Sequence, residues 1–399
     1  MHTTEQPRLA PRACAVEPFH VMRLLERAKT LEAEGRSIIH LEVGEPDFPT
    51  PEPILAAARA ALEDGAVHYT PAAGLPQLRE RLSRYYAERY GARVGADRIL
   101  VTPGASGAIQ LVFQALLEPG DEVLICDPSY PCYRQVLRLL GVEPRAVAVE
   151  AADDFQLSAA RAEAAWTPRV RALIVASPAN PSGTLLGREQ LAELLAFCRA
   201  KGIALIVDEI YQGLVYDAHD YTALEQADDV YVVNSFSKYF GMTGWRLGWV
   251  AAPRAAIEVM ERMAQNLFIA PNTPAQHAAL AAFEPATLEL LEQRRACFRE
   301  RRDALLSGLR RLGFGIDGEP KGAFYLYARL PEQVGMDSMR FATTMLEEVG
   351  VAATPGHDFG SHGAERHVRF AYTCDLPVID EALGRIDRFL AQCRESGAR

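Results

Sequence analysis

Two short stretches, ALIVA at 172–176 and IALIV at 203–207, are apolar at every position and restrict the possible folds more than any other feature of the chain. A strand with one face in water alternates apolar and polar residues, whereas an uninterrupted apolar run suits a parallel strand covered by helices on both faces. The predicted strands are 98–102, 122–126, 143–149, 171–176, 203–208 and 230–234. Helical patterns at 105–117, 131–140 and 188–200 alternate with them, so we expect an α/β protein with a doubly wound, mostly parallel sheet.

The pattern changes after Pro253, where long helices, including one at 286–312, precede a mixed α+β segment. A chain of 399 residues is also too long for one ordinary core, which favours two domains. The predicted units are a loose arm at 1–16, a large domain at 49–285, and a smaller α+β domain formed by 17–48 together with 286–399.

The N-terminal part of the chain carries its own helix and strand signals. We predict a helix at 18–34 and a strand at 37–43. A further helix is expected to run to Asp64, with Thr50 as its N-cap and Pro51 at its first position, because both residue types are favoured there.

Composition excludes several classes of protein. The net charge of −10, without a sustained basic run, argues against a nucleic-acid partner, and the arginines within 294–302 are interpreted as the solvated face of a helix. No apolar run approaches membrane-spanning length and the N-terminus lacks the apolar core of a secretion signal, so we expect a cytoplasmic protein with no membrane partner. The 7 cysteines include no C-x-x-C pair, which suggests neither a metal site nor a disulfide framework.

Polar side chains stand where the apolar strands stop. Asn180 follows ALIVA in a proline-bounded turn, Asp208 ends IALIV, and Lys238 comes shortly after the strand at 230–234. A loop of small residues at 104–107 links another strand to a helix. Each of these features is weak evidence alone. Together they are stronger, because one doubly wound sheet brings its strand ends to a single crevice.

Part of this set suits a phosphate group. The loop Gly104–Ser106 opens a helix, whose N-terminal N–H groups attract an anion. Ser235 and Ser237 can add hydroxyl donors, and the guanidinium of Arg246 can add a fork of N–H donors.

The rest of the set suits a pyridinium ring that bears an aldehyde. Asp208 can hold a positive charge on a ring nitrogen, while Asn180 and Tyr211 can bond a ring oxygen. Lys238 can form an imine once its amine is desolvated, since an ammonium group is not nucleophilic. Pyridoxal 5'-phosphate (PLP) requires all of these groups, whereas a dinucleotide would require an early G-x-G-x-x-G motif that the chain lacks.

A series of longer motifs occurs in one order over nearly the whole chain: LEVGEPDFPTP, HYTPAAGLPQLRE, TPGASGA, SPANPSG, VDEIY, SFSKYFGMTGWRLGW, KGAFYLY and HVRFAYT. In combination they resemble the class I and II aminotransferases, the PLP enzymes of fold type I. The resemblance implies a large PLP-binding domain around a mostly parallel seven-stranded sheet flanked by helices, a smaller α+β domain, and a homodimer with composite sites.

The same resemblance implies cofactor roles for individual residues. Lys238 matches the Schiff-base lysine that later moves the Cα proton, and Asp208 matches the partner of the pyridinium nitrogen. Asn180 and Tyr211 match the residues that bond the phenolic oxygen. The residues that match the phosphate site are Gly104, Ala105, Ser106, Ser235, Ser237 and Arg246.

Five further residues complete the site that the resemblance implies. Tyr130 is placed to stack on the ring, and Tyr69 matches a tyrosine that reaches the phosphate of the neighbouring subunit. Arg369 matches the arginine that forks the substrate carboxylate, assisted by the backbone of Gly44. Phe19 lies in the segment near the mouth of the site.

The implied reaction is a ping-pong transfer of an amino group from an L-amino acid to a 2-oxo acid such as 2-oxoglutarate or pyruvate. No Lys or Arg occurs between Gln265 and Phe283, and Ser106 stands where some aspartate-specific members carry a lysine, so we expect a neutral or hydrophobic donor. Aspartate aminotransferase stays the alternative, because a cation can enter from an unplaced loop. A PLP-dependent C–S lyase is a further alternative, since fold does not fix the reaction. A PLP-binding regulator is disfavoured, because only about sixteen residues precede the catalytic pattern.

Overall fold

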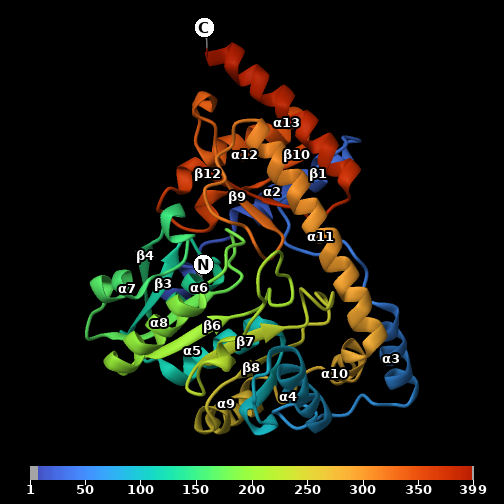
Figure 1. Ribbon diagram of the computed structural model, residues 1–399, viewed down its shortest axis with the longest axis vertical. Helices are drawn as coiled ribbons and strands as arrows, with labels where there is room; N and C mark the ends of the chain where they lie inside the picture. Colours follow the sequence, from blue (N-terminus) through green and yellow to red (C-terminus); the bar gives the residue numbers. More distant parts are fainter. Residues whose placement is uncertain (1–7, 398–399) are drawn as a thin grey trace, which may run out of the picture.

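The computed structural model describes residues 8–397, an α/β protein built around a mixed sheet of seven strands (Figure 1). In spatial order the strands are β2 (Ile99–Thr102), β8 (Gly248–Ala251), β7 (Tyr231–Ser235), β6 (Ala204–Asp208), β5 (Val170–Ala176), β3 (Glu122–Asp127) and β4 (Glu143–Ala148). All neighbours from β7 to β4 are parallel, and β8 is antiparallel to both of its neighbours. The predicted α/β class and mostly parallel seven-stranded sheet are therefore confirmed.

Helices cover both faces of this sheet, as the apolar runs predicted. One face is covered by α5 (Gly104–Leu116), α6 (Cys132–Leu139) and α9 (Arg254–Leu267). The other is covered by α4 (Pro76–Tyr90), α7 (Ala159–Ala165), α8 (Arg188–Lys201) and α10 (Thr273–Leu280), with α3 (Glu52–Glu63) packed on α10. Within β5, Ile174 belongs to the apolar cluster of the first face and its neighbour Leu173 to that of the second. Alternate residues of a strand point to opposite faces, so an all-apolar strand satisfies both helical layers.

A second, smaller group of strands and helices is built from segments near both ends of the chain. Strands β11 (Thr354–Pro355), β12 (His367–Ala371) and β9 (Tyr325–Arg329) form an antiparallel sheet, and β1 (Ile39–His40) pairs in parallel with β10 (Val351–Ala352). Its helices are α2 (His20–Ala33), α12 (Ser338–Val349) and α13 (Leu376–Gly397). The long helix α11 (Pro285–Arg311) runs from α10 to α13 along the side of the molecule (Figure 1). This arrangement agrees with a smaller α+β unit, while its exact boundaries stay a prediction.

Several local predictions differ from the structure. Thr50 is not an N-cap: α3 begins at Glu52 after Pro51, and the Thr50 hydroxyl donates instead to the carbonyl oxygen of Gly241 at 3.0 Å. Helix α4 and strand β8 were not predicted, since α4 is rich in polar and tyrosine residues and β8 is only four residues long. The predicted strand at 37–43 is reduced to β1, because only this short stretch finds a pairing partner.

The N-terminal arm is only partly within the described residues. Residues 1–7 lie outside them, and the described part contains the single-turn helix α1 (Pro11–Cys14). The predicted helix at 18–34 is observed as α2. No helix in the described part of the chain is both long enough and apolar enough to cross a bilayer.

The interpretation of the arginines within 294–302 as a solvated face is wrong for two of them. Arg301 and Arg302 on α11 are buried. The guanidinium of Arg301 binds both carboxylate oxygens of Asp47, at 2.8 and 2.9 Å, and lies 4.8 Å from the centre of the Phe48 ring. Helix α11 therefore holds the segment that follows Gly44 through the Arg301–Asp47 ion pair. The sequence pattern does not distinguish such a buried arginine from an arginine on the surface.

Candidate active site

A cavity of about 300 Å³ opens where the carboxyl ends of the parallel strands meet the N-terminal segment and the β11–β12 region. Twelve of the predicted site residues line it: Phe19, Gly44, Ala105, Ser106, Tyr130, Asn180, Asp208, Tyr211, Ser237, Lys238, Arg246 and Arg369. Strand-end geometry thus gathers side chains that lie far apart in the sequence.

Lys238 occupies the turn that follows β7. Its Nζ atom donates a hydrogen bond of 2.7 Å to the carbonyl oxygen of Gly44. Burial lowers the pKa of this lysine to about 8, although the nearby Glu45 opposes the shift; Arg369 and Arg246 add to it. An amine with this pKa is partly unprotonated near neutral pH, which is the state that a nucleophile or base requires.

Asp208 stands at the end of β6 and is almost fully buried. One of its oxygens accepts a hydrogen bond of 2.5 Å from the Tyr133 hydroxyl, and the other accepts the Ile210 N–H at 3.1 Å. Burial raises the pKa of this carboxyl to about 6, while the two hydrogen bonds and the charge of Lys238 act in the opposite direction. A positively charged group beside Asp208 would relieve this cost and favour the carboxylate.

Tyr133 is a site residue that the sequence reasoning missed. It lies on α6, three residues after Tyr130, and the two rings meet edge to face with centroids 5.5 Å apart. The available signal was the pair of tyrosines in SYPCY, although Tyr130 precedes α6 and Tyr133 lies within its first turn, so helical spacing does not relate them.

An anion cradle forms where α5 begins. Gly104 has a φ of 72°, and a Cβ atom at this position would lie 2.5 Å from Nη2 of Arg246. Only glycine allows the guanidinium to approach the helix terminus this closely. Arg246 has a φ of 52°, which is uncommon for a residue other than glycine and marks a constrained turn. The terminal N–H groups of α5 and this guanidinium lie together, an arrangement whose chemistry suits an anion such as a phosphate.

The two predicted serines of this cradle play different parts in the structure. Ser237 lines the cavity, whereas Ser235 is buried and does not. The Ser235 hydroxyl donates to the carbonyl oxygen of Leu247 at 3.0 Å and accepts the Ser237 N–H at 3.0 Å. Ser235 therefore shapes the turn that presents Ser237.

Arg369 on β12 brings a second guanidinium to the cavity. Its Nη1 donates to Oδ1 of Asn180 at 2.9 Å and its Nη2 to the carbonyl oxygen of Glu42 at 2.6 Å. Its Nε is buried and, among the described residues, has no hydrogen-bond partner. A buried guanidinium N–H without an acceptor is costly, which fits a position for a carboxylate ligand.

Tyr325 is a second residue that the sequence reasoning missed. Its hydroxyl is 2.8 Å from that of Tyr211, and the guanidinium of Arg369 lies 4.1 Å from its ring centre. A Cβ atom at Gly44 would lie 1.8 Å from the Tyr325 hydroxyl, so glycine is required where this segment crosses the ring. The signal was the tyrosine in KGAFYLY, but no sequence spacing places it beside Tyr211.

Tyr69 and Gly104 are predicted site residues that do not line the cavity. Gly104 lies directly behind it, against Arg246. Tyr69 is 82% exposed and lies on the surface of its own chain. Any contribution of Tyr69 to an active site therefore requires a second copy of the chain.

The mouth of the cavity is mainly apolar. Its apolar lining includes Phe19, Val21, Met22, Leu25, Ile109 and Val136. Lys238, Arg246 and Arg369 are the only Lys or Arg residues among the described residues that line the cavity, and Asp358 adds an acidic group near the start of α2.

A desolvated lysine and a buried carboxylate at the strand ends of a seven-stranded α/β sheet, with two guanidinium groups beside them, are the arrangement expected of a fold-type I, amine-handling enzyme. Residues 36–386 match the family described as Aminotransferase class I and II, and the chain belongs to this family. Members of the family use PLP to transfer amino groups, so this protein is a transaminase.

Individual relatives share the whole length of the chain. A (5-formylfuran-3-yl)methyl phosphate transaminase from Methanocaldococcus jannaschii is 37% identical over 96% of this chain and 99% of its own length. A valine–pyruvate aminotransferase from Mycobacterium tuberculosis is 38% identical over 96% and 98%, and an aspartate aminotransferase from Geobacillus stearothermophilus is 34% identical over 96% and 99%.

The fold is shared as well. The crystal structure of an aminotransferase from Mycobacterium tuberculosis superposes with a TM-score of 0.93 at 38% identity, covering 97% of this chain and 100% of that one. Because the relatives carry different substrate names, membership of the family leaves the amino donor open.

Proposed function

We propose that this protein transfers the amino group of a neutral or hydrophobic L-amino acid to a 2-oxo acid such as 2-oxoglutarate or pyruvate, by a ping-pong mechanism. The observation that carries this proposal is the cation inventory of the cavity: its lysine and both of its arginines already serve the reaction centre and the two anion sites. No further Lys or Arg among the described lining residues is free for a second carboxylate on the substrate side chain.

The described residues fit PLP. The start of α5 with Arg246 suits its phosphate, Asp208 suits a protonated ring nitrogen, and the Lys238 amine lies in the same cavity. Tyr211 and Asn180 line the cavity between these groups, where they can bond the ring oxygen, and Tyr130 supplies an aromatic face. Bound PLP supplies an electron sink that stabilises negative charge at the substrate Cα atom.

Lys238 is proposed to move the proton at Cα. Its pKa of about 8 lets the amine accept a proton and return it at near-neutral pH, as an acid–base catalyst must. The carbonyl oxygen of Gly44 directs the amine across the cavity in the absence of substrate. Asp208, once beside a ring cation, is proposed to stay ionised and to hold that ring protonated.

Arg369 is proposed to orient the substrate through its α-carboxylate. Its unpartnered Nε and its bond to Asn180 place the fork beside the proposed ring site. A planar guanidinium binds both oxygens of a carboxylate and so fixes its direction as well as its position.

The side chain of the donor is then directed toward the apolar mouth. Phe19 and Met22 come from the N-terminal segment, and Ile109 comes from α5. A distal carboxylate in this region would meet the acidic Asp358, and the described lining residues offer it no Lys or Arg beyond those already assigned. An unpaired charge in an apolar site is strongly disfavoured.

Aspartate as the donor is the second candidate, and the relative named aspartate aminotransferase favours it. The first rate to measure is that of the half-reaction with aspartate against those with alanine, valine, leucine and phenylalanine, using purified protein and PLP. We expect the neutral donors to react faster. A clear preference for aspartate would refute the proposal, and release of pyruvate from cysteine without an oxo acid would indicate the C–S lyase.

A homodimer is proposed to complete the active site. The proposed location of the protein is the cytoplasm. Tyr69 is exposed together with Val67, Leu267 and Ile269. The Thr273 hydroxyl donates to the carbonyl oxygen of His68 at 2.7 Å, so the segment around Tyr69 lies beside the start of α10. An exposed group of apolar side chains on an otherwise well-packed protein is typical of a subunit interface.

A further inference from the structure

The turn that carries Lys238 is held on its N-terminal side, where the Phe236 N–H donates to the Leu247 carbonyl oxygen at 3.1 Å and the Ser237 N–H to the Ser235 hydroxyl at 3.0 Å. After β7 ends at Ser235, the Gly241 N–H donates to the Lys238 carbonyl oxygen at 3.1 Å and the Met242 N–H to that of Phe236 at 3.0 Å. These bonds belong to turns rather than to a strand or a helix. The direction in which the Lys238 side chain leaves the turn must therefore depend on the side chains beside it.

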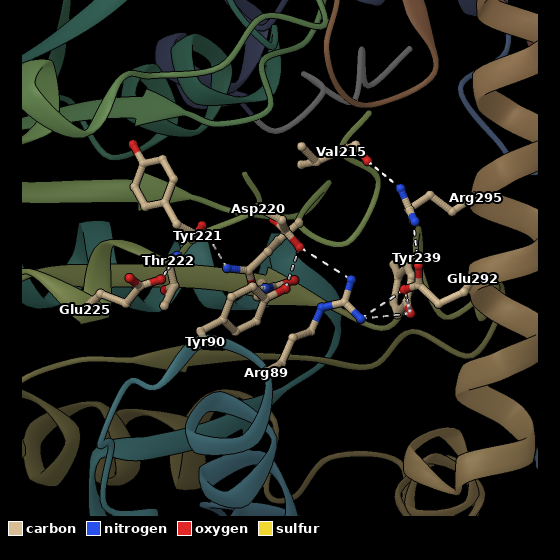
Figure 2. Close-up of polar contacts among 12 residues, drawn as sticks. Arg89, Tyr90, Val215, Asp220, Tyr221, Thr222, Glu225, Tyr239, Glu292 and Arg295 are labelled. Atoms are coloured by element: carbon tan, nitrogen blue, oxygen red, sulfur yellow. Dashed lines mark hydrogen bonds and ion pairs between the residues drawn. The ribbon is translucent and has the colours of Figure 1, made fainter. Parts of the chain in front are cut away.

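The next residue, Tyr239, does not line the cavity, and polar side chains hold its hydroxyl (Figure 2). Its ring is buried, and its hydroxyl donates to Oε1 of Glu292 at 2.6 Å. Nη1 of Arg89 donates to the same Tyr239 oxygen at 3.2 Å and to Glu292 at 3.0 Å. Burial opposes ionisation of Glu292, but its bonds from Tyr239 and Arg295 lower its pKa, so it stays charged and holds the tyrosine hydroxyl strongly.

The groups that hold Tyr239 are themselves tied to the segment 215–220 (Figure 2). Arg89 at the end of α4 reaches Asp220 at 3.5 Å, and the Tyr90 hydroxyl donates to the same oxygen at 2.9 Å. On α11, Arg295 donates to Glu292 at 2.6 Å and to the carbonyl oxygen of Val215 at 3.0 Å. The hydroxyl of Tyr239 is therefore held at a fixed point between α4 and α11.

The ring of Tyr239 also faces the segment that carries Tyr211. A Cβ atom on Gly213 would lie 2.6 Å from the Tyr239 ring, and Gly213 has a φ of 89°. Glycine at this position lets the ring lie directly on the backbone, two residues beyond Tyr211. Tyr239 therefore contacts the backbone near Tyr211 and directly follows Lys238, the two residues proposed to contact the cofactor.

We propose that Tyr239, held by Glu292 and Arg89, is a positioning residue for Lys238: it fixes the turn so that the lysine amine points into the cavity. This role rests on the proposed function, since it matters only if Lys238 bonds PLP. A purely structural role of the cluster would stabilise the fold without affecting the reach of the amine.

The test separates binding of the cofactor from attack by the lysine. In full-length protein freed of cofactor, the Lys238 amine attacks the aldehyde carbon of added PLP, a C=N bond forms and water leaves. The rate of this step is followed by absorbance, and the position of the bond is established by borohydride reduction and peptide mapping. Pyridoxine 5'-phosphate, which has an alcohol in place of the aldehyde, measures affinity for the phosphate and ring alone.

Tyr239→Phe removes the anchored hydroxyl and keeps the ring. Because the amine loses its fixed direction, we expect the bond to form about fivefold more slowly or worse, with affinity for pyridoxine 5'-phosphate changed by less than about twofold. Glu292→Ala should slow the step in the same way, and the double variant should be no slower than the slower single variant, because both remove one anchor. Tyr86→Phe is the matched control: Tyr86 lies on α4, is buried, and accepts a 3.0 Å hydrogen bond from Nε1 of Trp249.

Three results would overturn the inference: an unchanged rate in Tyr239→Phe, equal losses of rate and of pyridoxine 5'-phosphate affinity, or an equal slowing in Tyr86→Phe. If Tyr239→Phe does not fold, Glu292→Ala decides by the same two measurements. The wild-type protein separates failure of this inference from failure of the proposed function. If PLP bonds to a lysine other than Lys238 in the wild type, the proposed function fails. If PLP bonds to Lys238 in the wild type but Tyr239→Phe has no effect, only the positioning role of Tyr239 fails.

Discussion

The amine of Lys238 donates a 2.7 Å hydrogen bond to the carbonyl oxygen of Gly44, across 194 residues of sequence. This bond joins the turn after β7 to the segment that follows β1. In the proposed function a substrate or cofactor replaces this interaction, since an amine held by Gly44 has to leave it in order to react. The lowered pKa of Lys238 makes this exchange easier, because an amine that is partly neutral holds its acceptor less strongly.

Lys238→Ala should abolish covalent attachment of PLP and lower kcat by roughly 10³-fold or more, because both the nucleophile and the proton carrier are lost. Borohydride reduction followed by mass measurement checks the first effect, and steady-state kinetics the second. Lys201→Ala is the control, since Lys201 pairs with Glu163 at 2.7 Å on the surface. Retention of most activity in Lys238→Ala would contradict the assigned role.

Asp208→Asn should stabilise the protein without cofactor. The pKa of Asp208 is about 6 when folded, against a usual 3.8, so between these values the folded state binds more protons than the unfolded state and loses stability as the pH rises. Removing the charge should raise the free energy of unfolding by about 1–3 kcal/mol at pH 7, and by little below pH of about 4. Urea unfolding at both pH values measures this, with the exposed Asp228→Asn as control.

The same substitution should weaken PLP binding, since the carboxylate that would hold the ring nitrogen is gone. Equal stability of Asp208→Asn and wild type at pH 7 would show that burial of this carboxyl costs nothing. Tighter binding of PLP would show that Asp208 does not face the ring.

Arg369→Lys should raise KM for the amino donor roughly tenfold to a hundredfold, with a smaller fall in kcat. Lysine keeps the positive charge but loses the fork of N–H groups. Arg329→Lys is the control, because Arg329 lies on the adjacent strand β9 and pairs with Asp317 near the surface. A KM that is unchanged in Arg369→Lys would remove this residue from the substrate site.

Tyr69 offers a test of the composite site. A Tyr69→Phe variant should bind PLP several-fold less tightly, by the loss of one hydrogen bond to a charged group. When Tyr69→Phe and Lys238→Ala proteins are mixed and allowed to exchange subunits, each mixed dimer contains one site with both native residues. Activity should rise above the average of the two parents, and no rise would indicate that each chain completes its own site.

Asp47→Ala should destabilise the protein by about 2 kcal/mol, because the buried guanidinium of Arg301 loses its bidentate partner. Thermal unfolding of the variant against Asp317→Ala, which breaks a surface pair, measures the difference. A loss no larger than that of the surface variant would mean that solvent or Asp375 compensates Arg301 fully.

The positions gathered in the cavity were largely predictable, because apolar runs identify the parallel strands and parallel strands end at one edge. Asp208 is the last residue of β6, and Asn180 and Lys238 follow the ends of β5 and β7 within four residues, so the strand pattern alone is enough to place them. Tyr325 is different: it comes from β9, in another sheet, and its contact with Tyr211 depends on how the two sheets are placed. A pattern of neighbouring residues in the sequence does not predict how the two sheets are placed relative to one another.

Helix α11 shows the same limit for charges. Arg299 and Arg301 lie within one arginine-rich run, yet the side chain of Arg299 is 47% exposed and that of Arg301 only 4%. What decides between them is the segment at Asp47, which packs on one side of the helix only. Helix α4 was missed because its core-facing side is built partly from tyrosines, which blur the apolar pattern, and β8 because it is only four residues long.

The pairing of β1 with β10 also sets an order of events during synthesis of the chain. Ile39 and His40 emerge early, but their partners Val351 and Ala352 leave the ribosome only near the end of translation. Gly44 follows β1 and lines the cavity, so the wall that it forms cannot close around a newborn chain until more than three quarters of the chain exists. A truncation that removes β10 would leave the start of α5 and Arg246 in place, but the cavity wall at Gly44 would lack the pairing that holds it.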